Sequence, residues 1–398
     1  MALYIIIIIF VTASSLFTDG KKSSHSFSAA YLLTYLAVVC LLGFSRDLGG
    51  DKMGYIEDYK YCASFFDNFQ TIKIYYELQS LQRYAPLWIL LNILCKTISP
   101  HSINLLLFIH AIFVNGVIFW FFKKYSTYKF RCLLLYFIAN FFILNCETLR
   151  ETISIALFLL AYPSFIKGKW FKYYLLAALA IGFHYSAILI AILPVIPNVK
   201  IKHATMLLMF IIACFAYYTI NGFLISVSEV LSGSDGAMKS YSTYFSAGGN
   251  LNAFIFFQFI YVIFPYIVYA LSKHTAARQK IVILNPMINR YFIAAPIIAA
   301  CISFNRLFSY FSIFAIVVFI NIVTDMKKDE IKHILSIIIG CILVIFFTNQ
   351  YFRPYGYNLY RYDLFYPYTS VFDNIPTKHR ATIHKIGISS GHYQRSDD

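Results

Sequence analysis

Charged residues are scarce in this sequence. Only 13% of the 398 residues are Asp, Glu, Lys or Arg, while 60% are hydrophobic. Soluble domains carry about 25% charged residues, so a deficit of this size indicates a protein that lies in lipid. Because no long stretch is polar enough for a separate soluble domain, we expect one membrane domain with loops.

Acidic residues are scarcer still. There are 18 Asp and Glu residues against 33 Lys and Arg, which gives a formal net charge of +15. In a soluble protein this excess would favour nucleic acid as a partner. Here most basic residues lie in short loops between apolar runs, where membrane topology explains them, and no nucleic-acid-binding motif supports the other interpretation. We therefore expect no nucleic-acid partner.

The sequence also lacks the short motifs of nucleotide and metal chemistry. It has no P-loop, Rossmann glycine pattern, HExxH or GxSxG, so a nucleotide-driven cytoplasmic mechanism is not expected. Its eight cysteines show no CxxC or CxxH spacing, and most lie in or beside apolar runs, where cysteine behaves as a small hydrophobic residue. We expect neither a metal nor a cofactor.

Apolar runs are abundant, and many approach the roughly 20 residues with which a helix crosses a bilayer. The first begins at the N-terminus without the basic n-region of a signal peptide, so we expect it to be retained. The pattern predicts an all-α polytopic membrane protein with about 11–12 membrane segments, some short or broken. The runs are Leu3–Phe17, Phe27–Phe44, Ile103–Phe122, Cys132–Asn145, Leu149–Ile166, Tyr173–Ile196, Ala204–Ile225, Ala253–Leu271, Met287–Phe304, Leu307–Thr324 and His333–Phe352.

Basic residues between these runs predict the orientation, because cytoplasmic loops carry the excess of Lys and Arg. Placing every basic loop in the cytoplasm requires that Tyr84–Ser99 does not span, and we expect an amphipathic or re-entrant helix on the outer face. It also requires that Tyr173–Ile196 runs from the cytoplasmic side toward the outer side and back again, with a break near Gly182–Tyr185. The alternative is one ordinary span, which leaves Lys200 and Lys202 outside. The basic loop residues are Lys21, Lys22, Lys123, Lys124, Lys129, Arg131, Lys167, Lys169, Lys172, Lys200, Lys202, Lys273, Arg278, Lys280, Lys327, Lys328 and Lys332.

This orientation gathers the unusual polar groups on one side. The predicted membrane domain covers residues 1–352, with outer loops at 45–102 and 226–252, and a Tyr-rich tail at 353–398 is expected on the same outer side. Each half of the broken segment has about 12 residues, too few to cross a core of about 30 Å. Short broken helices are tolerated where their ends line a cavity, so we expect a site on the outer side.

Arg150 opens an apolar run and is the first candidate site residue. An Arg at the end of a membrane helix is costly to bury and is usually functional when it faces a cavity. Its planar fork binds phosphate bidentately, and a helix N-terminus favours an anion. The alternative is an Arg at the membrane interface, paired with Glu147 or Glu151.

His184 and Arg306 fall on the same side. A histidine can take a proton from a hydroxyl near neutral pH, which suits a general base, but a lone histidine in an apolar run is also typical of a buried structural residue. Arg306 separates two apolar spans almost without a loop. It would complete a diphosphate clamp, or alternatively it caps the turn between two helices. Arg290 is assigned to the cytoplasmic interface.

Two outer loops hold further candidates. Arg46 and Asp51 lie in the first loop. Paired acids such as those in this loop can act as acid and base or bind a metal, but no metal-ligand spacing appears. A solvated loop with a glycine turn explains these residues equally well. Tyr241 and Tyr244 lie in the second loop. Tyrosine favours the headgroup region in general, so these two residues are only weak indicators of sugar stacking.

Five short motifs occur in order along the chain. They are a loop with Arg46, Asp51, Tyr55 and Tyr59, then Thr148–Ala156, Ile181–Ala187, Asn305–Phe311 and Phe365–Tyr368. Together they resemble the EpsG family of bacterial polysaccharide polymerases, which is related in role to the Wzy O-antigen polymerases. The chain departs from the family pattern at Glu151, where a Gln is frequent, and at Lys52–Gly54, which intervene before Tyr55.

The resemblance implies a fold similar to GT-C-type membrane glycosyltransferases. It implies a polymerase that joins oligosaccharide repeat units carried on undecaprenyl diphosphate into O-antigen or exopolysaccharide, at the periplasmic face of the bacterial inner membrane. Donor and acceptor are then lipid-linked oligosaccharides, and membrane lipid and a chain-length regulator are further expected partners. The sugar–diphosphate bond already supplies the energy, so no nucleotide is needed.

On this basis we expect an inverting, metal-independent glycosyl transfer. His184 would deprotonate the acceptor hydroxyl, while Arg150 and Arg306 stabilise the departing diphosphate. Arg46 would assist the two arginines. The supporting residues expected around them are Glu147, Glu151, Asp51, Tyr241 and Tyr244.

Three other classes of membrane protein compete with this hypothesis. A lipid-linked oligosaccharide flippase would also be polytopic with intramembrane Arg, but it should distribute charge along a path through both leaflets. A membrane O-acyltransferase would need an acyl-donor site reachable from the cytoplasm. A purely structural subunit would not explain costly arginines between apolar spans.

Overall fold

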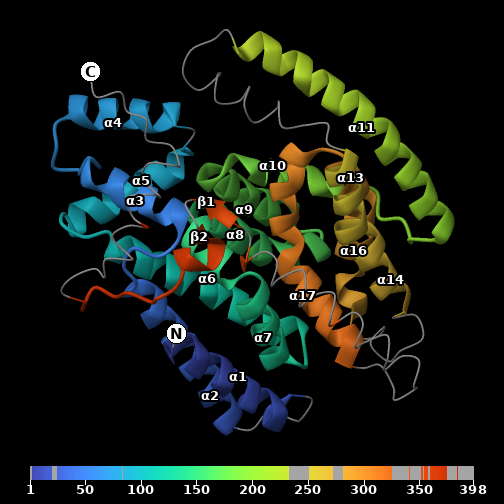
Figure 1. The fold of residues 1–398 in the computed structure, drawn as a ribbon, viewed down its shortest axis with the longest axis horizontal. Coiled ribbons are helices and arrows are strands. Elements are labelled where there is room, and N and C mark those ends of the chain that lie inside the picture. The colour runs from blue at the N-terminus through green and yellow to red at the C-terminus, as the bar shows by residue number, and fades with distance from the viewer. Residues whose placement is uncertain are drawn as a thin grey trace.

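The chain forms a bundle of helices in the computed structural model (Figure 1). The helices of the first part are α1 (Ala2–Thr18), α2 (His25–Gly43), α3 (Gly50–Lys60), α4 (Phe69–Leu81), α5 (Pro86–Ile98), α6 (Asn104–Tyr125), α7 (Lys129–Ala139), α8 (Leu149–Ile166), α9 (Trp170–Phe183) and α10 (Ile188–Ile192). The structure describes residues 2–19, 25–82, 84–232, 251–271, 281–324, 340, 351–352, 354–356, 359–373 and 383.

The second part continues the same architecture. Its helices are α11 (His203–Ser232), α13 (Leu251–Gln258), α14 (Phe264–Leu271), α16 (Asn285–Ile298) and α17 (Ser309–Thr324), followed by strands β1 (Pro354–Gly356) and β2 (Leu359–Tyr360). The shorter 3₁₀ and π turns are η1 (Ile143–Glu147), η2 (Tyr185–Ala187), η3 (Leu193–Val195), η4 (Phe259–Ile263), η6 (Val282–Leu284), η7 (Ile302–Phe308) and η8 (Arg361–Leu364).

The prediction of an all-α polytopic membrane protein is confirmed. Among the described residues, five helices are long and apolar enough to cross a membrane, and shorter apolar helices accompany them. The five are Asn104–Tyr125, Leu149–Ile166, His203–Ile220, Leu251–Ala270 and Phe304–Thr324. The predicted segment His333–Phe352 falls almost wholly outside the described residues.

The outer helices and the centre of the bundle differ in burial. Figure 1 shows α3, α4 and α5 on one flank and α11, α13, α14 and α16 on the other, with α8 and α9 between them. In the long helix α11, Leu207, Ile211 and Phe215 are exposed. Tyr136, Tyr162 and other large side chains fill the centre instead. Exposed apolar side chains on an outer helix are what lipid contact requires.

Three buried polar side chains of the central helices hydrogen-bond to one another. Asn115 donates to the Asn145 side chain at 2.9 Å, Asn145 donates to the Tyr136 hydroxyl at 2.7 Å, and Tyr136 donates back to Asn115 at 3.1 Å. These residues come from α6, η1 and α7. An unsatisfied polar group in a membrane interior costs several kcal/mol, so this closed network fixes the register of the three elements.

The broken segment predicted around His184 is present. Helix α9 ends at Phe183, and His184 is extended, with φ −153° and ψ 125°. The Tyr173 hydroxyl, near the start of α9, donates to the Ile190 carbonyl in α10 at 2.5 Å. In a straight helix these residues would be about 25 Å apart, so the chain must turn back at His184 and run beside α9.

The ends of the helices fall into two groups. At one end, Asp19 accepts from the Phe130 and Arg131 backbone at 3.2 and 2.9 Å, and Arg131 donates to Thr324 at 3.2 Å. This end therefore collects the ends of α1 and α17 and the start of α7, next to several of the basic loops. At the other end, Asn104 at the start of α6 donates to the Gly43 carbonyl at 2.9 Å.

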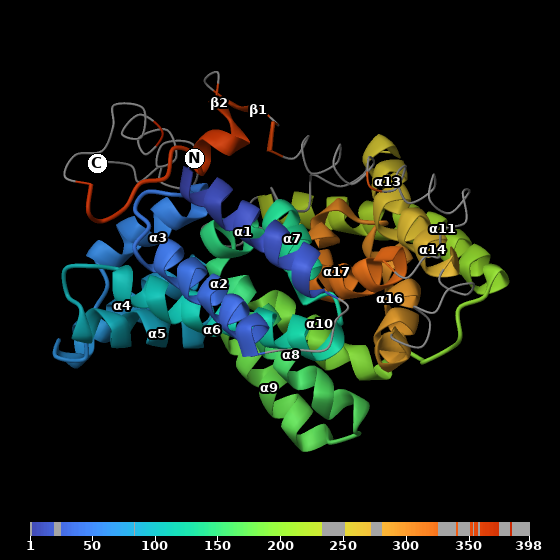
Figure 2. The same ribbon diagram turned by 90° about the horizontal axis from the view of Figure 1, so that it is seen from below.

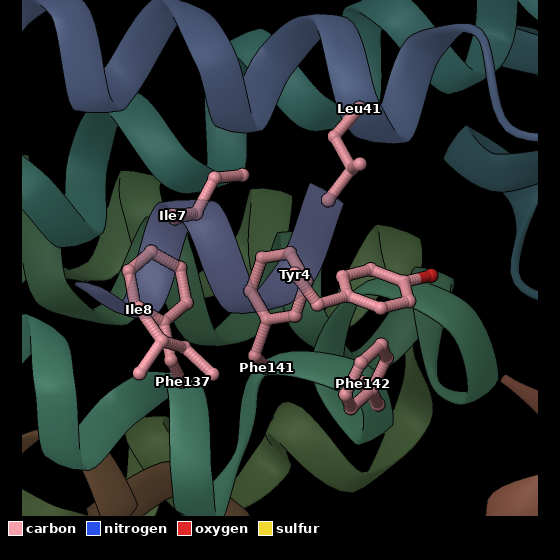
Figure 3. Close-up of a pocket in the computed structure, with 7 residues that line it drawn as sticks. All are labelled: Tyr4, Ile7, Ile8, Leu41, Phe137, Phe141 and Phe142. Atoms are coloured by element: carbon pink, nitrogen blue, oxygen red, sulfur yellow. The ribbon is translucent and has the colours of Figure 1, made fainter. Parts of the chain in front are cut away.

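The N-terminus and the described part of the tail lie at this second end. Figure 2 shows the N-terminus and β1–β2 on one side of the helices, with the lower end of α9 on the opposite side. Tyr4 packs edge-on against Phe142 at 5.0 Å between ring centroids. Figure 3 shows the small apolar cavity beside it, about 30 Å³, between α1, α2 and α7. Its lining is apolar and its volume is far below that of a ligand pocket, so it is not a candidate binding site.

Candidate functional site

Helix α3 is fixed against the start of α8 by Glu147. The two carboxylate oxygens of Glu147 accept from the backbone N–H groups of Gly50 at 2.9 Å and Asp51 at 3.1 Å. These N–H groups belong to the first turn of α3, which otherwise lacks acceptors, and the helix N-terminus also favours a negative charge. Burial, together with the charge of Asp51, raises the pKa of the Glu147 carboxyl to about 7.

Gly49 makes this close approach feasible. Its φ is +83°, and a Cβ placed there would lie 2.2 Å from the Cys146 carbonyl oxygen. Only glycine adopts this backbone conformation without strain and leaves room for the neighbouring chain. The first outer loop, for which a solvated glycine turn was one of two interpretations, is therefore a packed connection that brings α3 to the N-terminus of α8.

Arg150 is held between two tyrosines. Its Nε donates to the Tyr55 hydroxyl at 3.1 Å, and its guanidinium lies over the Tyr84 ring at 4.1 Å from the centroid. The Tyr84 hydroxyl in turn donates to the Asp58 carboxylate at 2.6 Å. Stacking on an aromatic face and a hydroxyl acceptor orient a guanidinium while leaving its charge in place.

His184 occupies the break between α9 and η2, and its Nδ1 faces Ser186. The Ser186 backbone N–H donates to Nδ1 at 3.3 Å, and the Ser186 hydroxyl lies 2.6 Å from the same atom. The Ser186 hydroxyl also contacts the Tyr310 hydroxyl at 2.9 Å. A backbone N–H can only donate, so Nδ1 is an acceptor and the neutral ring carries its proton on Nε2.

The charges of two arginines reach His184. Burial lowers the pKa of the His184 imidazole to about 3, and the positive charges of Arg150 and Arg306 add to this effect. The ring is therefore neutral throughout the physiological range. Because the charges of Arg150 in α8 and Arg306 in η7 both act on His184, which precedes η2, these three elements lie around one site.

Arg306 approaches this site from η7. It is exposed, and its charge also acts on Tyr55 and on Glu151. Glu151 is only 2% exposed, and it hydrogen-bonds Ser309. One carboxylate oxygen of Glu151 and the amide oxygen of Asn305, beside Arg306, are buried without a hydrogen-bond partner among the described residues.

Asp51 lies at the same place but is exposed. Its charge acts on Tyr55, Glu147, Arg150 and Glu151, so it belongs to the group around Arg150. In the part of the chain that the structure describes, no group of three or more His, Cys, Asp or Glu side chains is arranged to hold a metal ion.

A comparison with protein families identifies the family of the chain. The model of the EpsG family matches residues 28–370, which is most of the chain. The chain belongs to the EpsG family. No curated protein and no solved structure matches it. The resemblance predicted from five sequence motifs is thereby confirmed, and every motif lies within the matched range.

Four of the five EpsG-like motifs contribute to the site. Thr148–Ala156 carries Arg150 and Glu151, Ile181–Ala187 carries the His184 break, and Asn305–Phe311 carries Arg306 and Tyr310. The first-loop motif adds Asp51 and Tyr55. The fifth, Phe365–Tyr368, packs instead against the N-terminal helices, where the Tyr368 hydroxyl donates to the Leu41 carbonyl at 2.9 Å.

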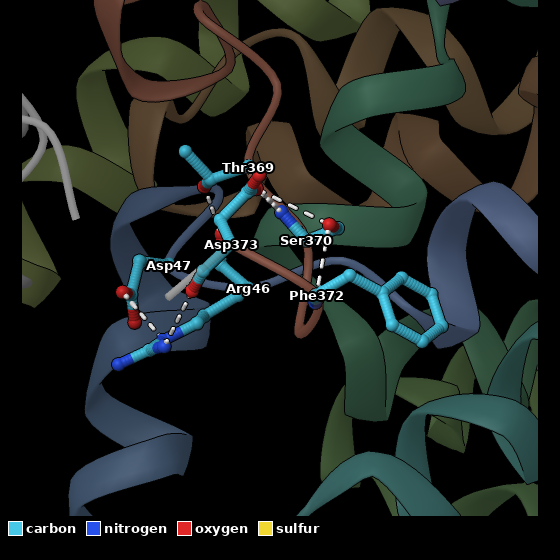
Figure 4. Close-up of polar contacts among 6 residues, drawn as sticks. All are labelled: Arg46, Asp47, Thr369, Ser370, Phe372 and Asp373. Atoms are coloured by element: carbon cyan, nitrogen blue, oxygen red, sulfur yellow. Dashed lines mark hydrogen bonds and ion pairs between the residues drawn. The ribbon is translucent and has the colours of Figure 1, made fainter. Parts of the chain in front are cut away.

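Arg46 lies elsewhere on the same end of the molecule. It pairs with Asp47 at 3.4 Å and donates to the Asp373 carbonyl at 3.4 Å, as Figure 4 shows. Its backbone N–H donates to the Thr369 carbonyl at 2.9 Å. These contacts join the first loop to the tail. Arg46 also lines a cleft of about 780 Å³ that Tyr59, Lys60, Lys96 and His101 help to form.

The other residues predicted from sequence are placed as follows. Arg290 lies at the opposite end of α8 from Arg150, because its guanidinium stacks on the Phe165 ring at 4.8 Å and donates to the Leu193 carbonyl at 3.2 Å. Tyr241 and Tyr244 lie outside the described residues.

Sequence reasoning missed several residues of this candidate site. Tyr84 and Asp58 hold Arg150, and Ser186 and Tyr310 hold His184. The one indication of these residues in the sequence was that the segment containing Tyr84 was expected on the outer face. Lys52, which departs from the family pattern, is buried and donates to the Ser45 hydroxyl, so it anchors the first loop.

Proposed function

We propose that this EpsG-family chain is a membrane polymerase. It joins oligosaccharide repeat units carried on undecaprenyl diphosphate into an O-antigen or exopolysaccharide. The observation that carries the proposal is the convergence of Arg150, Arg306 and His184 at one end of the helices in a chain of this family. Two guanidinium groups beside a neutral imidazole suit a reaction in which a diphosphate leaves.

In the proposed orientation this end faces the periplasm. Support comes from the positions of the loops: the ends of α1 and α17 and the start of α7 meet beside basic loops at the opposite end, and positive loops stay in the cytoplasm. The protein would then be an inner-membrane protein of bacteria. Its donor and acceptor would reach the site from the lipid, between helices.

The chemical step is a displacement at the anomeric carbon of the donor sugar. The acceptor hydroxyl attacks this carbon, the bond to the diphosphate oxygen breaks, and the electron pair leaves with the lipid-linked diphosphate. Arg150 and Arg306 stabilise the charge that develops on this oxygen. Such an inverting transfer needs no nucleotide and is proposed to need no metal.

The cleft around Arg46 is proposed to hold part of the glycan. Its volume of about 780 Å³ lies in the range of ligand pockets, and its lining mixes hydroxyl, amide, tyrosine and cationic groups. It opens on the same end of the molecule as the Arg150 group. In this assignment Arg46 contributes to substrate binding, at a distance from the bond that breaks.

Surface polysaccharide from a deletion strain tests the proposal. Restoring the natural chain should restore long glycans, whereas Arg150→Ala and Arg306→Ala should give single repeat units at equal protein abundance. Arg290→Ala is the matched control, since Arg290 is also an aromatic-stacked arginine but at the opposite end. Normal chain length in both site variants refutes the diphosphate clamp. Absence of any repeat unit at the surface would indicate a flippase instead.

A further inference from the structure

The hydrogen bonds of His184 decide which of its nitrogen atoms can act. The Ser186 backbone N–H occupies Nδ1 as a donor, and the Ser186 hydroxyl, which can accept from Tyr310, donates to the same nitrogen. The neutral ring therefore keeps its proton on Nε2. A nitrogen that already carries a proton donates a hydrogen bond and cannot take up the proton of an attacking hydroxyl.

The proton of the attacking sugar hydroxyl must then go to another group near Arg150. Asp58 is buried and accepts from the Tyr84 hydroxyl. The remaining carboxylates there are Asp51, Glu147 and Glu151, and the charge of Asp51 acts on both glutamates. Glu147 is 7% exposed and both of its oxygens accept from the backbone of α3. Glu151 is 2% exposed and is engaged by Ser309 and by the charge of Arg306.

Asp51 differs from the other two carboxylates. It is exposed, in the first turn of α3, and its backbone N–H is held by Glu147 at 3.1 Å. Its charge acts on Arg150 and on Tyr55, the tyrosine that Arg150 contacts at 3.1 Å. The carboxylate is thus accessible to a substrate and is carried by a helix whose start is fixed.

We infer that Asp51 accepts the proton of the attacking sugar hydroxyl, while His184 donates a hydrogen bond to the substrate through Nε2. This inference rests on the proposed polymerase function. As the new bond forms between the acceptor oxygen and the anomeric carbon, the hydroxyl proton moves to the Asp51 carboxylate. The diphosphate leaves with the electron pair of the broken bond, and Asp51 then returns the proton to water.

Two pairs of variants test this assignment in purified protein reconstituted with lipid-diphosphate oligosaccharide. Asp51→Asn keeps the shape of the side chain but removes the base, so the rate should fall by about 10²–10⁴-fold. His184→Gln keeps an N–H donor near Nε2 and should lose no more than about tenfold, whereas His184→Ala should lose at least about 100-fold. Formate should partly restore Asp51→Ala, because a small carboxylate can replace the missing base.

The controls separate a failed inference from a failed function. Each variant is compared by its elution profile and thermal midpoint, and Asp51→Glu supplies a second carboxylate variant, which should keep more activity than Asp51→Asn. Full activity of Asp51→Asn, or no formate effect on Asp51→Ala, overturns the role of Asp51. Equal loss in His184→Gln and His184→Ala overturns the donor role of His184. If the natural protein itself forms no polymer, the proposed function fails instead.

Discussion

At the scale of single residues, the site depends on how each cation is held. Tyr55 and Tyr84 orient Arg150 through a hydroxyl and a ring face, which fix the guanidinium without cancelling its charge. His184 is held through Nδ1 by Ser186, and Tyr310 supports Ser186. Groups positioned in this way need little rearrangement as charge develops on a leaving diphosphate, which is the condition for electrostatic catalysis.

The lowered pKa of His184 predicts a dependence of stability on pH. In the unfolded chain an imidazole takes up a proton near pH 6.5, but burial and the charges of Arg150 and Arg306 delay this to about pH 3 in the folded protein. Between these values the unfolded state binds more protons, so stability falls as pH is lowered through 6.5. The thermal midpoint of the natural protein should therefore drop more between pH 7.5 and pH 5 than that of His184→Gln. Parallel curves for the two proteins would contradict the shift.

The two arginines of the site could be recognised in the sequence because burying an arginine in a membrane is costly. Arg150 and Arg306 stand between apolar spans, where an arginine is expensive unless it has a function. Their partners could not be found in this way. Tyr55 and Arg150 are 95 positions apart, and Ser186 and Tyr310 are 124 apart. Tyrosine and serine are common in membrane proteins, so only the fold distinguishes these from the others.

At the scale of elements, two connections create the site. The break at His184 returns the chain beside α9, as the contact between Tyr173 and Ile190 demonstrates. The basic loops predicted this break, because the orientation of the later segments requires a return. The packing of α3 on Glu147 could not be predicted, since an acid in the sequence does not reveal which helix N-terminus it will meet.

The connection before α3 provides a test at this scale. Gly49→Ala should strain the backbone by about 1–3 kcal/mol at its φ of +83°. Its Cβ would also collide with the Cys146 carbonyl, so α3 should shift and displace Asp51 and Tyr55. We expect a lower thermal midpoint and a strong loss of polymer formation.

Gly54→Ala is the control for this prediction. Gly54 lies inside α3, and a Cβ there would meet no atom within 4 Å. Alanine is favoured over glycine inside a helix by about 0.5–1 kcal/mol, so this variant should match or slightly exceed the natural stability. Equal behaviour of the two variants would show that the Gly49 turn does not position α3.

At the scale of the whole molecule, the two ends of the bundle have different chemistry. Arg150, His184 and Arg306 gather at one end, while Arg290, the ends of α1 and α17 and the start of α7 lie at the other. Hydropathy and basic loops were sufficient to predict the apolar helices and their orientation, but not α3 and α4, which lie in the predicted outer loop 45–102. Which helices are neighbours was not predictable, because apolar surfaces in a membrane match one another with little specificity.

The two arginines of the proposed reaction allow the most direct test. Purified protein in proteoliposomes receives lipid-diphosphate oligosaccharide, and the released lipid diphosphate is counted against the new glycosidic bonds. The natural protein and Arg290→Ala should release one lipid diphosphate for each bond formed, while Arg150→Ala and Arg306→Ala should be slower by at least about 100-fold with an unchanged elution profile. Undiminished release and chain growth in both site variants would contradict the account.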